Sequence, residues 1–169
     1  MDGAPMEVEV VRSARRKKTV QARVVDGVIR VSVPERMSKA DEDRYVAQLV
    51  ARLQRRRDAG VIDVAARASA LAARYGLPKP ASVRWVDNQG SRWGSCTPAD
   101  GSLRISTRIA AFPSWVVDAV IVHELAHLAV PSHGPAFWAL ANRYPRMERA
   151  RGFLIAKGLP DPDDAGQDT

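Results

Sequence analysis

The sequence predicts an α+β fold in which a small antiparallel sheet lies beside one active-site helix and further helices flank both. Alternating apolar and polar residues adjoin Asp-Gly pairs at 26–27 and 100–101, a pattern typical of β-hairpins. Longer segments between and after these stretches have the apolar spacing and the end signals of helices. One of these helical segments contains the pattern H-E-x-x-H, at residues 123–127.

The N-terminal part is expected to form β structure followed by a helix. Residues 7–33 have β character, and Asp26-Gly27 predicts a two-residue turn between two alternating runs. Pro34 ends the second run, and Ser38 is a suitable N-cap for an amphipathic helix that continues to about Arg57. A basic cluster precedes the hairpin, and we interpret it first as a solvated edge and second as an anion-binding surface. The cluster consists of Arg12, Arg15, Arg16, Lys17 and Lys18.

A second helix and a second β region follow. The helix is predicted from about Ile62 to Tyr75, where Gly76 ends it. The β region contains a strand around Val83, the stretch RWGSC at 92–96 and a strand over 103–108. We expect these strands to form the short antiparallel sheet beside the H-E-x-x-H helix.

Three more helices are predicted in the C-terminal half. Ser114 is the expected N-cap of the H-E-x-x-H helix, which should end near residues 128–130 because Pro131 cannot continue it. Pro135 fits the first turn of the next helix. The last helix is expected to begin at Pro145 and to end near Lys157.

Length, cysteine content and charge restrict the class of protein. The 169 residues favour one domain, placed at residues 1–158, followed by an acidic tail at 159–169 that we expect to be disordered. The single cysteine, Cys96, excludes an intramolecular disulfide and fits the cytoplasm, while the lack of a long uncharged apolar run argues against a membrane protein. The net charge is +7, and setting aside the four tail aspartates leaves +11 for residues 1–158, which predicts a weak association with nucleic acid.

All three histidines of the chain lie within eleven residues, which predicts a metal site. His123 and His127 are four residues apart and therefore share one face of a helix. The turn at Pro131 can bring His133 back toward them. Three neutral nitrogen ligands with one open position are typical of catalytic zinc, so we predict one zinc ion per chain. Glu124 projects to the side of the ligands, where it can act as a general base.

RWGSC at 92–96, HELAH at 123–127 and HGPAFW at 133–138 together resemble the YgjP-like metal-dependent hydrolases, or zinc metallopeptidase domains, and more distantly the SprT-like proteases. The resemblance implies a zincin-like α+β core. It also implies zinc held by His123, His127 and His133, with catalysis by Glu124. The chain departs from this family at Ser106, where we would expect asparagine, which bears on substrate contacts and not on the metal motif.

The leading functional hypothesis is zinc-dependent hydrolysis of peptide or protein substrates, with Glu124 accepting the proton of the attacking water. Arg92 and Ser95 are the candidate substrate contacts, although for Arg92 we favour a structural role, stacked on Trp93, over a role in the cleft. One alternative is a metal-dependent hydrolase of nucleotides or other acidic small molecules. Another is a nucleic-acid-binding protein with a structural zinc, which would need Cys96 or a carboxylate as its fourth ligand.

Overall fold

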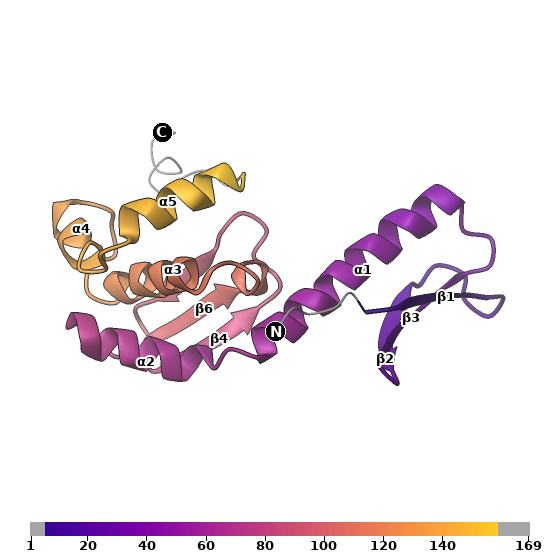
Figure 1. Ribbon diagram of the computed structural model, residues 1–169, viewed down its shortest axis with the longest axis horizontal. Helices are drawn as coiled ribbons and strands as arrows, with labels where there is room; N and C mark the ends of the chain where they lie inside the picture. The colour runs from indigo at the N-terminus through magenta and orange to yellow at the C-terminus, as the bar shows by residue number, and fades with distance from the viewer. Residues whose placement is uncertain (1–5, 159–169) are drawn as a thin grey trace. The chain divides into compact units, whose positions relative to one another are not determined.

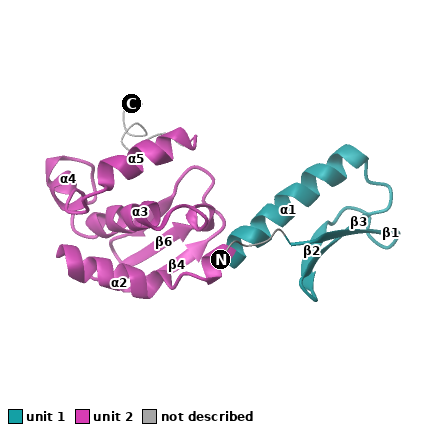
Figure 2. Ribbon diagram, in the orientation of Figure 1, with its two compact units in different colours: residues 1–57 teal, residues 58–169 magenta. Residues whose placement is uncertain are grey.

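The computed structural model of the protein describes residues 6–158. The chain divides into two compact units, Met1–Arg57 and Asp58–Thr169, which Figure 2 shows in different colours. The expectation of one domain over residues 1–158 stays a prediction, because this division does not test whether the units fold independently. The expected disorder of residues 159–169 lies outside the described residues.

The first unit contains a three-stranded sheet and a helix (Figure 1). The predicted hairpin is confirmed, since the second and third strands of this sheet pair antiparallel around a turn in which Asp26 and Gly27 both have positive φ. The first strand pairs parallel with the third, which lies in the middle of the sheet. The elements are β1 (Val8–Ser13), β2 (Gln21–Val25), β3 (Val28–Pro34) and α1 (Lys39–Gly60).

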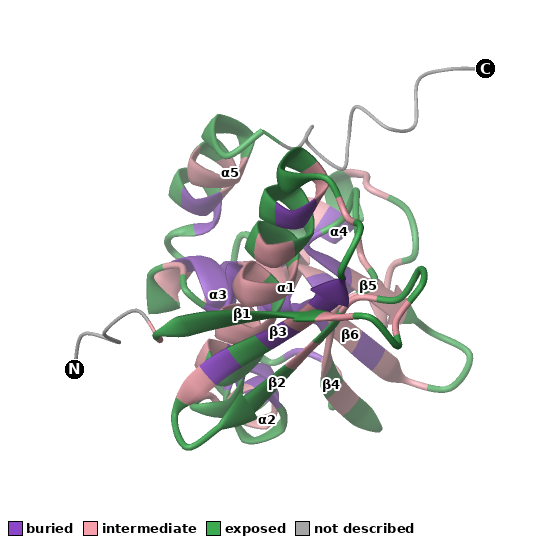
Figure 3. Cartoon of the chain, turned by 90° about the vertical axis from the view of Figure 1, so that its right-hand side faces the viewer, coloured by how far each residue is buried: buried purple, intermediate pink, exposed green. Residues whose placement is uncertain are grey.

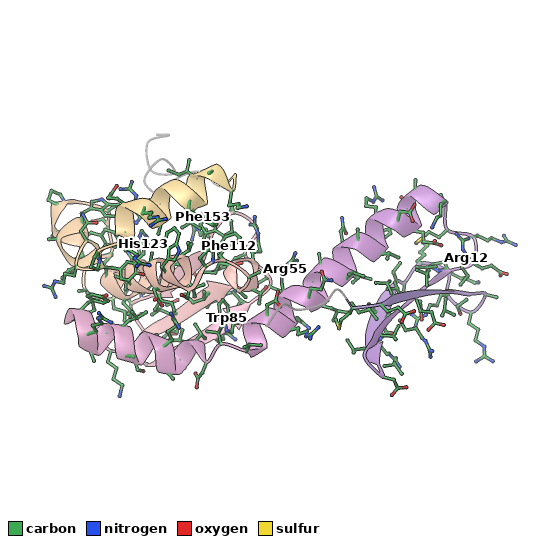
Figure 4. All side chains as sticks on the ribbon, viewed as in Figure 1. Arg12, Arg55, Trp85, Phe112, His123 and Phe153 are labelled. Atoms are coloured by element: carbon green, nitrogen blue, oxygen red, sulfur yellow. The ribbon has the colours of Figure 1, made fainter. Side chains whose placement is uncertain are left out.

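The core of this unit lies where β3 packs against the apolar stripe of α1. Ile29, Val31 and Val33 are fully buried, and Val46 and Leu49 are among the α1 side chains that cover them. The predicted N-cap is confirmed, because the Ser38 hydroxyl accepts a hydrogen bond from the Asp41 amide at 3.1 Å. Beside this core the buried Glu42 carboxylate pairs with Arg12 at 2.6 Å and with Lys39 at 2.9 Å. Figure 4 labels Arg12 in this unit.

The second unit also contains a three-stranded sheet, with helices packed on it (Figure 1). The α+β class is therefore confirmed. The strand order is β4-β6-β5, in which β5 and β6 form the predicted hairpin. The elements are α2 (Val64–Tyr75), β4 (Ser82–Val86), β5 (Gly94–Thr97), β6 (Ser102–Ser106), the 3-10 turn η1 (Thr107–Ile109), α3 (Ser114–His127), α4 (Pro135–Ala141) and α5 (Met147–Ala156).

The pairing of β4 corrects the expectation of a purely antiparallel sheet. β4 runs parallel to β6, which lies between β4 and β5 in the sheet. An Asp-Gly pair specifies only the partner of the next strand in the chain, so it predicted the β5–β6 hairpin and carried no information about β4. The sheets of both units are consequently mixed, with one parallel and one antiparallel pair each.

Several helix boundaries differ from the predictions by one to three residues, and α1 ends at Gly60 rather than near Arg57. α2 begins at Val64 because Asp63 is its cap and accepts a hydrogen bond from the Ala66 amide at 2.9 Å. Ser114 is the first residue of α3 rather than its N-cap, which is Pro113. α5 begins at Met147 instead of Pro145. The ends of α2 at Gly76, with φ of 59°, and of α3 before Pro131 are confirmed.

α3 is the central helix of the second unit. It packs against α2, α4, α5 and the strands β5 and β6, so most of its side chains are buried (Figure 3). An ion pair between Arg67 and Asp118 joins α2 to α3. Among the nine buried residues of α3, Glu124 is the one that carries an ionisable group. A carboxyl group in such apolar surroundings is costly, so its position is more readily explained by chemistry than by stability.

None of the helices within residues 6–158 combines the length and the apolar character needed to cross a membrane.

Candidate metal centre

The structure brings all three histidines together. His123 and His127 lie on the last turns of α3, and His133 lies in the turn before α4. The Nε2 atom of His123 is 3.2 Å from Nε2 of His127 and 3.1 Å from Nε2 of His133. One potential ligand atom from each ring lies within 4.8 Å of those of the other two. Figure 4 marks His123 within the second unit.

The turn between α3 and α4 explains how His133 reaches the other two rings. α3 ends at His127, and the Val130 amide donates to the Ala126 carbonyl oxygen at 3.0 Å, which closes the last turn. Pro131 then prevents continuation of the helix. Gly134 is extended, with φ of −147° and ψ of −175°, and Pro135 begins α4 in the position favoured by proline. Pro131, Gly134 and Pro135 thus produce the change of chain direction that His133 needs to reach His123 and His127.

The three rings fit a divalent cation. Zinc at about 2.0–2.1 Å from each nitrogen of a tetrahedral site places the nitrogens about 3.3 Å apart, close to the two shortest separations here. The backbone carbonyl of Val130 lies 3.2 Å from Nδ1 of His127, so a proton on Nδ1 leaves Nε2 as a lone-pair donor. A hydrogen on Nε2 of His123 would satisfy only one of its two neighbours, whereas a cation satisfies all three lone pairs. Burial lowers the pKa values of His123 and His127, which keeps both rings neutral.

Aromatic side chains of α4 hold the histidine rings. The Phe137 ring is fully buried and its centroid lies 4.4 Å from that of His127. The Trp138 ring lies nearly parallel to His133, with centroids 6.1 Å apart and an interplanar angle of 24°. These contacts restrict the ring orientations, which is the role that surrounding residues commonly have in metal sites.

Glu124 lies beside the histidine group but is not part of it. Its side chain is 6% exposed, and within residues 6–158 the group that could hold a metal contains neither Glu124 nor Cys96. Burial raises the pKa of Glu124 to about 8, and the positive charge of Arg92 acts in the opposite direction. A divalent cation near the carboxyl group would act in the same direction as Arg92 and favour the ionised form.

Gly94 is a site residue that sequence reasoning missed. A Cβ atom at this position would lie 2.7 Å from Oε1 of Glu124 and 2.8 Å from its Cγ. The backbone of β5 therefore lies directly against the Glu124 side chain. A glycine inside a strand often marks such a close approach, so the G of RWGSC was the available signal.

A pocket of about 570 Å³ connects β5, the histidines and α5. Arg92 and Ser95 both line it, so the structure places both candidate substrate contacts beside the histidine group, although their role remains a prediction. The Ser95 hydroxyl accepts a hydrogen bond from Nε2 of Gln89 at 2.7 Å. The stacking considered for Arg92 is instead made by Arg108, whose guanidinium lies 4.7 Å from the Trp93 ring centroid.

Cys96 also lines this pocket, on β5. Burial raises the pKa of its thiol to about 11, and the negative charges of Glu124 and Asp100 act in the same direction. The thiol is therefore protonated near neutral pH. Because it is also outside the histidine group, Cys96 does not supply the fourth ligand that a closed structural zinc site would need.

Comparison with known proteins agrees with this geometry. The model of the YgjP-like family, metallopeptidase domain, matches residues 57–155, nearly the whole described part of the second unit. No curated protein matches the chain.

Two solved structures are similar to the chain. The metallopeptidase zymogen abylysin of Pyrococcus abyssi is 18% identical with a TM-score of 0.50, and the alignment covers 56% of this chain and 94% of that one. The metallopeptidase zymogen jannalysin of Methanocaldococcus jannaschii is 16% identical with a TM-score of 0.49, covering 57% and 97%. At this identity the likeness to abylysin concerns the fold alone.

Proposed function

Since the chain belongs to the YgjP-like family and carries its metallopeptidase domain, we propose that it hydrolyses peptide bonds. In this proposal His123, His127 and His133 hold a zinc ion, and Glu124 is the general base. The observation that carries the proposal is the convergence of three imidazoles beside one buried carboxyl group in an open pocket. This arrangement matches a catalytic site with one free coordination position better than a closed structural site.

The residues divide the chemistry between them. When bound, zinc would lower the pKa of water to about 7 and polarise the peptide carbonyl. A carboxylate oxygen of Glu124 accepts the proton of the attacking water and later delivers it to the leaving amine. Burial favours the protonated form of Glu124 after the first transfer, while the Arg92 charge favours the ionised form before it. The β5 backbone at Gly94 lies against the Glu124 side chain and restricts its position.

The edge of the sheet supports an extended peptide as the substrate. β5 is an edge strand, since it pairs only with β6 on one side within the described sheet, and its residues line the pocket. An extended chain can pair with such an edge through backbone hydrogen bonds, which do not depend on its side chains. Zinc as the metal, a cytoplasmic location and the association with nucleic acid stay predictions.

Zinc content and peptide hydrolysis test the proposal together. We expect about one zinc ion per chain by elemental analysis, and cleavage of unfolded protein and of mixed peptides that stops on chelation and returns on adding zinc. His133→Ala should lose both zinc and activity. Full zinc occupancy in His133→Ala would remove His133 from the ligand set. A zinc-loaded chain that cleaves no peptide in a broad mixture would refute peptide hydrolysis.

A further inference from the structure

The wall of the pocket formed by α5 contains one charged residue. The α5 side chains that line the pocket are otherwise uncharged, and Arg151 is the exception. Arg92 supplies a second guanidinium from the segment before β5. Glu124 is the one acidic residue among the described lining residues, and it is buried. The accessible charge of the pocket is therefore positive.

Contacts with neighbouring side chains restrain Arg151. Its guanidinium lies 4.3 Å from the centroid of the Trp138 ring, and the same ring stacks on His133. Its Nη1 atom donates to Oε1 of Glu148 at 3.1 Å, but that carboxylate is 71% exposed, so the pair is weak and exchangeable. A planar cation is thus preorganised beside the site of reaction.

We propose that Arg151 is a specificity-determining residue that selects peptides carrying a carboxylate close to the scissile bond. This inference rests on the proposed function and names its substrate class. An arginine fork can hold a carboxylate through two parallel hydrogen bonds, and the partly enclosed pocket reduces the screening of that interaction by water. The carboxylate has two possible sources, an acidic side chain or the C-terminus of the peptide, and both offer the same group.

The test compares matched peptides that differ only in one carboxylate. One pair exchanges Glu for Gln beside the scissile bond, and the other exchanges a C-terminal carboxylate for an amide. We expect kcat/KM of the zinc-loaded full chain to favour the acidic member of at least one pair by about 10- to 100-fold, the range of one charge-assisted hydrogen-bonded pair. The pair that shows the preference identifies the source of the carboxylate.

Substitutions then assign the preference to Arg151. Arg151→Gln should lower kcat/KM for the acidic peptide at least tenfold more than for its neutral twin. Arg151→Lys, which keeps the charge without the fork, should retain part of the preference. Arg149→Gln is the matched control, because Arg149 lies on the same helix with its guanidinium 4.9 Å from the Trp115 ring centroid and does not line the pocket. That control should keep the full preference.

A binding measurement separates this inference from the proposed function. Fluorescence anisotropy with zinc-loaded Glu124→Gln gives the affinity of each peptide without turnover, and the acidic member should bind about tenfold or more tightly only when Arg151 is present. Equal binding and equal cleavage of acidic and neutral peptides would overturn the inference while leaving peptide hydrolysis intact. Equal losses on both peptides in Arg151→Gln would also overturn it. A charge preference in binding without any cleavage would instead reject the proposed hydrolysis.

Discussion

Substitution of Gly94 by alanine tests how closely the position of Glu124 is controlled. The new Cβ would lie 2.7 Å from Oε1, 2.8 Å from Cγ and 2.9 Å from Cδ of Glu124, whereas ordinary contacts begin at 3.4 Å. The strand cannot retreat easily, because Gly94 is paired with the fully buried Ile105 of β6 and the Trp93 carbonyl accepts from the Ser106 amide at 2.9 Å. The Glu124 carboxyl group must therefore move by roughly 0.5–1 Å. A displacement of about 1 Å typically costs about 100-fold in rate, so we expect kcat/KM to fall by that order.

The assay is peptide hydrolysis by purified Gly94→Ala, with zinc content and thermal unfolding measured on the same sample. Zinc content should be unchanged, because the three atoms nearest to the new methyl group all belong to Glu124 and none to a histidine, while overpacking should cost about 1–3 kcal/mol of unfolding free energy. Gly90→Ala is the control, since a Cβ at Gly90 meets no atom within 4 Å. Combining Gly94→Ala with Glu124→Asp, which shortens the side chain, should lose less than the product of the two single losses. Wild-type activity in Gly94→Ala would refute the positioning argument.

Three further predictions concern ionisable groups. Glu124→Gln should reduce hydrolysis by about 100- to 10,000-fold while zinc content and folding persist, and loss of zinc in this variant would make Glu124 a ligand or a ligand support. Because the pKa of Cys96 is raised to about 11, its alkylation by iodoacetamide should be slow at pH 8 and should accelerate about tenfold per pH unit toward pH 11. Unfolding of the protein should make the alkylation fast. Rapid alkylation of the folded protein at pH 7 would contradict the burial of the thiol. The pKa of Glu42 is lowered by Lys39 and Arg12 below its usual 4.5, so this group stabilises the fold above pH 4.5 and the contribution is lost as the pH falls through the lowered value. Denaturant unfolding between pH 6 and pH 2 should show that loss, and an equally steep loss in Glu42→Gln would assign it to other groups.

The convergence of the three histidines was largely predictable because its determinants are local. The four-residue spacing of His123 and His127 places both rings on one helical face wherever that helix packs. Pro131 ends the helix through its own covalent geometry, and Pro135 begins the next one, so the return of His133 required no knowledge of distant residues. The same holds for the hairpin turn at Asp26-Gly27 and for the αL residue Gly76 at the end of α2.

The environment of the site was not predictable, because it consists of contacts between segments far apart in the chain. The parallel pairing of β4 with β6 depends on which strand fills the middle of the sheet, and no turn signal encodes that choice. The missing side chain of Gly94 has meaning only once β5 lies on α3, thirty residues later in sequence. The sequence around Arg151 on α5 does not distinguish this residue from an ordinary surface arginine.

The sequence by itself therefore determined the candidate ligand set, the candidate base and the helix that carries them, since backbone geometry and rotational period act over a few residues. Tertiary structure alone decided how buried Glu124 is, which backbone holds it and which cations face the pocket. Desolvation and electrostatic fields depend on everything within several ångströms in space, irrespective of distance along the chain.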